Sequence, residues 1–426
     1  APRSRRWRLL LYLLLASALA AAAALLFFEL RSAHFQAREL SRYAATLTYR
    51  VEPGPSPDIL YPADGPFDKR QGYAYLPLML ERLQQRDFLI SEQARFSPAL
   101  MAYSRRGLFP PFAEKSQTGL SISDCRGTPF YEFRYPQQGY ADFASIAPLV
   151  VSSLLFIENR HLLDSDQPLA NPAVDWPRFA MAALSQIGKV LDVQDQSAGG
   201  STLATQLEKY RHSPDGVTGS ALDKLKQMAS ASVRAYRHGP QTLAARQRLV
   251  LEYLDTVPLS AAPGYGEVNG LGDGLWVWFG SDFATINELL TLADGEGELL
   301  DAQGLAMRQI IGLMIAHRRP TWYLNNGRAD LAELTDSYLR IMANTGEISP
   351  ALRDAALRQQ LHFRDFRQNP VSIPSATNKG VNMARTRISS MLGVPLYDLD
   401  RLDLRARTSL NGELQEAVTS YLHSLA

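Results

Sequence analysis

The residues best suited to bind a charged ligand lie in the stretch Ser197–Tyr210, which reads Ser-Ala-Gly-Gly-Ser-Thr-Leu-Ala-Thr-Gln-Leu-Glu-Lys-Tyr. Its glycines allow a close approach of the backbone, and Ser201 and Thr202 stand where a helix N-cap is expected. From Leu203, apolar residues recur at i, i+4 and i+7, which predicts a helix. A helix N-terminus with a nearby cation, here Lys209, suits a phosphate. The alternative is a capped helix after a flexible loop, without a ligand.

Glu158 is the residue best suited to acid–base chemistry. It follows the apolar stretch Leu149–Ile157, which predicts a helix. A carboxylate at the end of an apolar helix is partly withdrawn from water, and this suits a general base or a general acid. The alternative is a surface glutamate paired with Arg160.

Helical patterns dominate the region that carries these residues. Residues 221–237 form an amphipathic pattern with Lys224, residues 247–254 carry Glu252, and the helical period continues over residues 286–362. We find no convincing strand from residue 147 to residue 362, so this region is predicted to be mainly α. The glycines between residues 264 and 274 lack the strand–turn–helix setting of a dinucleotide-binding fingerprint.

The N-terminus predicts a membrane anchor. Four arginines precede an apolar run from Leu9 to Phe28. At 1.5 Å per residue this run crosses a hydrocarbon layer of about 30 Å, and the arginines favour a cytoplasmic N-terminus. A cleaved signal peptide is the alternative, because Ala16–Ala20 offers acceptable cleavage sites. The apolar run continues beyond what such a peptide needs, which favours an uncleaved single-pass anchor.

The segment after the anchor predicts a support for the next unit. Residues 31–50 resemble a helical stalk, and prolines crowd residues 51–67. A helical stretch at 76–85 and two short strands, 120–123 and 130–135, joined by a hairpin turn at 124–129, predict a small α+β pedestal in which no chemistry is visible.

Composition excludes several classes of protein. The 426 residues carry a formal net charge of +1, which gives no support for nucleic-acid binding. The single cysteine, Cys125, excludes an internal disulfide and any cysteine-based zinc site. The length allows two or three domains with a sizeable core.

The apolar stretch before Glu158, the glycine-rich stretch before Leu203 and the helical segments with Lys224 and Glu252 follow one another along the chain. In this order, residues 147–362 resemble the peptidoglycan glycosyltransferases of glycosyltransferase family 51. The first family motif, Glu-Asp-Arg-x-Phe-x-x-His, is matched by Glu158–Ser165. The second, Gly-Gly-Ser-Thr-Ile-Thr-Gln-Gln-Leu, is matched by Gly199–Leu207. The third, Arg-Lys-x-x-Glu, falls on Asp223–Gln227, and the fourth, Leu-Glu-x-Tyr-Leu-Asn, falls on Leu251–Asp255.

The resemblance implies a fold and a reaction. The expected fold is a mainly α, lysozyme-like glycosyltransferase domain behind one transmembrane helix and the pedestal. The expected reaction polymerises lipid II and releases undecaprenyl pyrophosphate, with Glu158 as general base and Gln227 in the place of a second catalytic carboxylate. The substrate-binding residues that the resemblance implies are Arg160, Gly200, Ser201, Thr202, Gln206, Lys209, Lys224 and Glu252.

Departures from the motifs leave a second interpretation open. Gln227 replaces the second carboxylate, and an amide cannot neutralise a cation or exchange a proton. Asp223 also stands where the family has an arginine. The chain is therefore read as a divergent polymerase, or as a non-catalytic relative that binds lipid II, glycan or a partner synthase. A lysozyme-like hydrolase or an envelope scaffold agrees less well with the anchor and the ordered motifs.

The expected organisation divides the chain into four parts. These are residues 1–31 for the cytoplasmic arm and anchor, 32–146 for the stalk and pedestal, 147–365 for the glycosyltransferase domain, and 366–426 for a linker and the start of a transpeptidase region. We expect a piece of a longer protein, since residues 404–425 resemble the opening of the transpeptidase region of class A penicillin-binding proteins and no Ser-x-x-Lys motif occurs.

The resemblance also implies partners and a location. The expected partners are lipid II, the nascent glycan strand, the bacterial inner membrane and other cell-wall synthases. The domain is expected on the periplasmic side. No cofactor is certain, and a divalent cation, Mg²⁺ or Mn²⁺, is left open.

Overall fold

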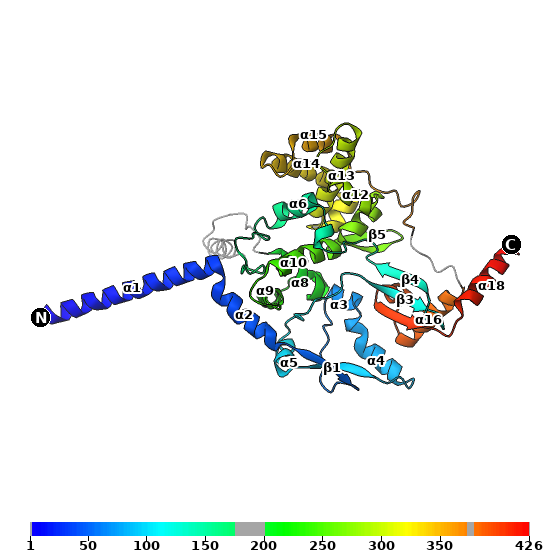
Figure 1. Ribbon diagram of the computed structural model, residues 1–426, viewed down its shortest axis with the longest axis horizontal. Helices are drawn as coiled ribbons and strands as arrows, with labels where there is room; N and C mark the ends of the chain where they lie inside the picture. Colours follow the sequence, from blue (N-terminus) through cyan, green and yellow to red (C-terminus); the bar gives the residue numbers. More distant parts are fainter. Residues whose placement is uncertain (1, 175–200, 373–378, 426) are drawn as a thin grey trace.

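The computed structural model describes residues 2–174, 201–372 and 379–425. Helix α1 (Pro2–Ser32) projects away from the rest of the molecule, as Figure 1 shows. Its segment Leu11–Ser32 has a mean hydropathy of 2.4 and is exposed along its apolar part, and only its last residues contact α2 (His34–Thr46), where Phe28 packs against Phe35. This helix is consistent with the predicted single-pass anchor. A second helix of sufficient length, α13 (Glu298–Ala316), is largely buried and belongs to the core.

The predicted stalk and pedestal form a helix and two small sheets. Helix α2 (His34–Thr46) leads to β1 (Tyr49–Pro53), which pairs antiparallel with β2 (Glu92–Phe96). Strands β3 (Thr118–Ser123) and β4 (Pro129–Tyr135) form the predicted hairpin. In its turn, a carboxylate oxygen of Asp124 accepts from the backbone N–H groups of Arg126 and Thr128. The other pedestal helices are α3 (Pro66–Arg70), α4 (Leu76–Gln84) and α5 (Pro98–Arg105).

The helical body forms two groups in Figure 1. The upper group surrounds α13 and contains α6 (Pro148–Glu158), α12 (Phe283–Leu289), α14 (Arg328–Asn344) and α15 (Pro350–Arg358). The lower group contains α8 (Leu203–His212), α9 (Ala221–Ala235) and α10 (Leu243–Thr256). A continuous apolar core joins the two groups, and Met307, Ile310 and Ile311 of α13 lie in it with almost no exposed surface. The mainly α prediction is confirmed.

The prediction that residues 147–362 contain no strand is wrong. Strands β5 (Pro258–Ala262) and β6 (Gly266–Asn269) pair antiparallel. Gly264 and Gly266 have φ of 75° and 95°, which glycine adopts without a Cβ clash. The glycines therefore shape a tight hairpin, whereas their spacing alone indicated only a loop. The short α11 (Gly270–Gly274) and a π-helical turn at Leu275–Phe279 follow.

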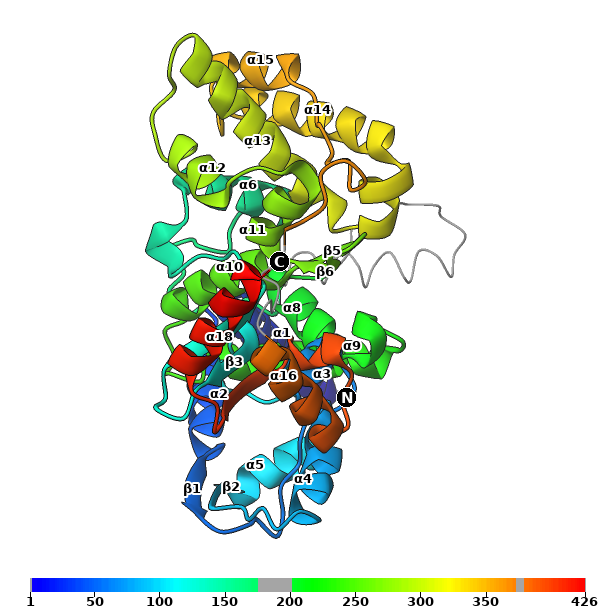
Figure 2. The same cartoon turned by 90° about the vertical axis from the view of Figure 1, so that its right-hand side faces the viewer.

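The C-terminal segment returns to the pedestal. Strand β7 (Asp403–Arg407) pairs parallel with β3, so β3 becomes the central strand of a three-stranded sheet. Helix α16 (Lys379–Leu392) packs against α4, and Figure 2 shows it close to the pedestal helices. The remaining short elements are α17 (Leu396–Leu399), α18 (Gly412–Ser424), a π-helical turn (Trp322–Asn326) and 3₁₀ turns (Tyr73–Tyr75, Phe143–Ser145, Pro214–Gly216).

Candidate active site

Helix α6 delivers Glu158 to the centre of the molecule. Pro148 stands at its first position, where a missing N–H costs nothing, and an apolar sequence carries the helix to Glu158. The helix ends at Glu158, and the next residue, Asn159, has an extended backbone. A carboxylate at a helix C-terminus meets the negative end of the helix dipole, so it needs nearby donors or cations.

Helix α8 supplies one such donor from a capped N-terminus. Thr202 and Thr205 form a reciprocal cap: Thr205 N donates to Thr202 Oγ1 at 3.3 Å, and Thr202 N donates to Thr205 Oγ1 at 3.0 Å. One turn further on, Gln206 Nε2 donates to Glu158 Oε2 at 2.9 Å. The hydroxyl of Tyr210 donates to Gln206 Oε1 at 3.2 Å and fixes the orientation of this amide.

The segment after α13 places one cation, Arg318, and one histidine, His317, beside Glu158. His317 Nε2 and Arg318 Nη2 each lie 3.5 Å from Glu158 Oε1. Arg318 Nη1 also donates to the hydroxyl of Tyr338 at 2.9 Å, which holds the guanidinium in place. The Glu158 side chain is 10% exposed, so its carboxylate lies at the wall of a cleft and is not sealed in the core.

Two lysines belong to this region: Lys209 in the last turn of α8, and Lys224 of α9 beside the α8 N-terminus. Lys224 Nζ donates to Ser201 Oγ at 2.7 Å and to Thr205 Oγ1 at 3.3 Å. Burial, followed by the nearby charge of Lys209, lowers the pKa of Lys224 to about 8. Burial also lowers the pKa of Lys209, although Glu158 opposes this shift. Two partly desolvated ammonium groups, one of them beside a helix N-terminus, make a favourable environment for an anion.

These groups border one open cleft of about 880 Å³. Glu158, Ser201, Gln206 and Lys209 line it, and Lys224 joins it through its bond to Ser201. The pedestal also contributes to the wall through α3, where Arg70 Nη2 donates to Asn269 Oδ1 at 2.9 Å. The volume lies within the usual range for sites that enclose a small molecule.

Four of the residues predicted to act in the site do not line this cleft. Thr202 is buried and caps α8. Gln227 is fully buried, and its Nε2 donates to Ser213 Oγ at 2.9 Å and to Thr218 Oγ1 at 3.0 Å. The guanidinium of Arg160 stacks on the Phe156 ring at 4.1 Å and does not line the cleft. Glu252 accepts from Arg211 Nη1 at 2.8 Å. Gly200 lies outside the described residues.

Sequence reasoning missed His317 and Arg318. Both follow the apolar helix α13, just as Glu158 follows the apolar helix α6. The same pattern that selected Glu158, a polar group directly after an apolar helix, therefore also marked these residues.

The divalent cation stays untested. In the described ranges, no three His, Cys, Asp or Glu side chains cluster in a way that could hold a metal ion. The position of the family's second carboxylate carries the amide of Gln227, which is enclosed by hydroxyl groups. These residues do not fit a protein-held cation.

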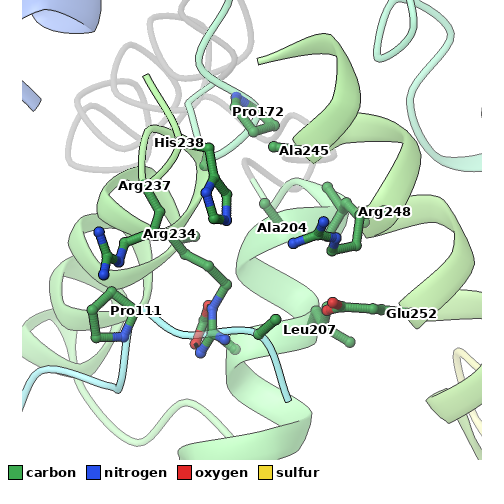
Figure 3. Close-up of a pocket in the computed structure, with 15 residues that line it drawn as sticks. Pro111, Pro172, Ala204, Leu207, Arg234, Arg237, His238, Ala245, Arg248 and Glu252 are labelled. Carbon is green, nitrogen blue, oxygen red and sulfur yellow. Dashed lines mark hydrogen bonds and ion pairs between the residues drawn. The ribbon is translucent and has the colours of Figure 1, made fainter. Parts of the chain in front are cut away.

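A second group of charged side chains gathers around the C-terminal half of α8, which carries Glu208, Arg211 and His212. We call it the buried ion cluster, and its members are Asp68, Glu114, Glu208, Arg211, His212, Arg234 and Glu252. It borders a small cavity of about 60 Å³, into which Arg234 and Glu252 point from α9 and α10 (Figure 3). Asp68 and Glu114 come from the pedestal, so the cluster joins the pedestal to the helical body.

His212 lies at the centre of this cluster. Its Nδ1 is 2.6 Å from Asp68 Oδ1 and its Nε2 is 3.2 Å from Glu114 Oε2. Burial alone lowers the pKa of His212, but Glu114 and Asp68 outweigh burial and raise it to about 9. In turn, His212 and Arg234 outweigh the burial of Glu114 and lower its pKa to about 2. His212 and Glu114 are therefore both charged near neutral pH.

The fold and the cleft define a helical protein in which a glutamate and a lysine line one cleft. The family model "Transglycosylase" matches residues 126–355, which is more than half of the chain. The chain therefore belongs to the transglycosylase family, glycosyltransferase family 51, and has a peptidoglycan glycosyltransferase-type function. No curated protein matches it.

Proposed function

We propose that the chain polymerises lipid II into glycan strands and releases undecaprenyl pyrophosphate. One observation carries this proposal: Glu158 and the ammonium group of Lys209 border the same cleft. Glycosyl transfer from a pyrophosphate needs a proton acceptor and a cationic group at the leaving phosphate, within one substrate length of each other.

In the proposed reaction, Glu158 takes the proton of the C4 hydroxyl of the acceptor sugar. The hydroxyl oxygen forms a bond to C1 of the donor, and the bond from C1 to the pyrophosphate oxygen breaks with inversion. Lys209 and Lys224, together with the N-terminus of α8, stabilise the charge that develops on the leaving group. Gln206 holds the carboxylate of Glu158 in position.

The anchor supports a lipid-linked substrate. Helix α1 is long and apolar enough to lie in the bilayer that holds lipid II. We place the chain in the bacterial inner membrane with a cytoplasmic N-terminus and a periplasmic catalytic domain. The nascent glycan strand is the second proposed ligand, and other cell-wall synthases stay predicted partners.

A non-catalytic relative is the second candidate. The buried amide of Gln227 favours it, because this residue carries no charge and does not border the cleft. Such a protein would bind lipid II without converting it.

The test uses the full chain in detergent with fluorescent lipid II. We expect glycan chains on gels and stoichiometric release of undecaprenyl pyrophosphate. A chain that binds lipid II but forms neither product would overturn the proposed polymerase in favour of the non-catalytic candidate. A chain that neither binds nor converts lipid II would overturn both.

A further inference from the structure

The two ring nitrogens of His317 have different surroundings. Nδ1 faces the backbone carbonyl oxygen of Met314 within hydrogen-bonding distance. A carbonyl oxygen can only accept, so Nδ1 carries a hydrogen. Nε2 then has either a lone pair or a second hydrogen, and this nitrogen faces Glu158 Oε1 at 3.5 Å. The carbonyl of Met314 thus fixes the tautomer and aims the basic nitrogen at the carboxylate.

The space between Nε2 and Oε1 is a place for one proton. With no proton there, two lone pairs face each other, and with one proton the two groups form a hydrogen-bonded pair. The other carboxylate oxygen of Glu158 is held by Gln206, so Oε1 is the oxygen that can exchange a proton with His317. Catalytic hydrogen bonds are often long without substrate and shorten when it binds.

We infer that His317 is a positioning residue that accepts, through Glu158, the proton released by the acceptor hydroxyl. This inference rests on the proposed function. The hydroxyl proton moves to Glu158 as the new glycosidic bond forms and the bond to pyrophosphate breaks. Glu158 Oε1 then passes this proton to His317 Nε2, which restores the carboxylate. The imidazolium finally loses the proton to water in the cleft, which His317 also lines.

The charges around His317 agree with this role. Burial lowers the pKa of His317, Glu158 opposes this effect, and Arg318 and Lys209 add to it. From α10, the Tyr253 ring meets the imidazole edge-on with ring centres 5.9 Å apart. The neutral imidazole is therefore the resting form, ready to receive a proton. Once charged, it is repelled by Arg318 and Lys209, which favours release.

His317 also compensates for the amide at position 227. Gln227 cannot exchange a proton and lies outside the cleft. In the part of the chain that the structure describes, His317 is the titratable group that stands beside Glu158 and can exchange its proton near neutral pH.

The first test compares the full chain with H317Q and H317A, and uses H362A, which changes an exposed histidine, as the control. We expect H317Q to lose roughly 10- to 100-fold in kcat for lipid II polymerisation, with KM and melting temperature close to those of the parent. Added imidazole should restore H317A, in proportion to the neutral imidazole present, and leave H362A unchanged. The acid limb of the parent's pH–rate profile should shift in H317Q.

An H317Q variant within threefold of the parent at every pH would overturn the relay and leave the polymerase intact. No polymer from the parent would instead overturn the proposed function. A further measurement needs no activity: ¹⁵N chemical shifts of the labelled histidines, assigned with H317Q, report the tautomer. We expect hydrogen on Nδ1 of His317 at pH 7, and hydrogen on Nε2 alone would overturn the inference.

Discussion

The buried ion cluster and the Glu158 cleft use the same residue types for different ends. Each places a histidine beside a glutamate and an arginine. His212 contacts two carboxylates inside a closed cluster, and its pKa rises to about 9. His317 contacts one carboxylate, and burial, helped by the charges of Arg318 and Lys209, lowers its pKa. The balance of neighbouring charges therefore decides whether a buried histidine is a fixed cation or a group that can exchange a proton.

The two regions also differ in role, because the buried ion cluster holds parts of the fold together and the cleft is suited to bind a ligand. The buried ion cluster joins the pedestal to the body through charges in ion-pair contact, and a charge held in an ion pair has little tendency to react. The cleft keeps Lys209 and Lys224 without a carboxylate in ion-pair contact among the described residues, which leaves both ammonium groups ready for an anionic ligand.

The largest expected effect comes from removing the centre of the cluster. H212L removes the cation beside the buried carboxylate of Asp68 and one of the cations beside Glu114, which costs about 3–5 kcal/mol of unfolding free energy. Thermal unfolding of the solubilised chain measures this loss. The matched variant H362L, at an exposed site, should stay within about 0.5 kcal/mol of the parent. Equal melting of H212L and the parent would show that the cluster is not a structural joint.

The pH dependence of stability should identify His212 as a cation. Because its pKa is raised, the folded chain binds this proton more tightly than the unfolded chain. Its stabilising contribution is complete below about pH 6.5 and is lost as the pH rises through about 9. The melting difference between the parent and H212L should therefore shrink from pH 6 to pH 10. A constant difference would mean that His212 stabilises by packing alone.

An effect of intermediate size is expected at Lys224. Since the pKa of Lys224 is about 8, its positive charge is lost as the pH rises through that value. Affinity for lipid II should fall by about tenfold between pH 7 and pH 9, which is the scale of one charged hydrogen bond. K224R, which stays charged, should retain its affinity, and K226R on the same helix should behave like the parent. Parallel curves for all three proteins would exclude Lys224 from the anion site.

The smallest expected effect concerns Thr202. Its side chain caps α8, so T202A should lower the unfolding free energy by about 1 kcal/mol and leave turnover unchanged. The melting temperature and the polymerisation rate, measured on the same sample, show whether Thr202 caps the helix or binds the substrate. Lost turnover with unchanged melting would favour the substrate-binding role that the family motif implies.

Local patterns were sufficient for much of the site. The apolar run before Glu158, the cap before Leu203 and the position of Lys209 follow from helix periodicity and capping, which act over a few residues. These signals placed Glu158 at the end of α6, and the cap and Lys209 on α8. The β3–β4 hairpin was predicted for the same reason.

Contacts between distant segments were beyond such patterns. His317 meets Glu158 only because α13 and α6 pack together, and spacing along the chain does not encode that packing. Gln227 stands three residues after Lys224, and this spacing predicts that the two side chains lie on one face of a helix. The long Lys224 side chain reaches Ser201, whereas the shorter Gln227 turns to Ser213. Strand β7 lies near the end of the chain and pairs with β3, which lies in the first third of the sequence. Local propensity cannot predict a pairing between segments so far apart.

The most direct test of the account is kcat of E158Q at saturating lipid II, with binding measured on the same preparation. The glutamine keeps the shape and the hydrogen bond to Gln206 but cannot accept a proton. The account predicts a fall of at least about 100-fold in kcat with unchanged affinity. An E158Q variant that polymerises lipid II at the parent's rate would contradict the assignment of Glu158 as the base.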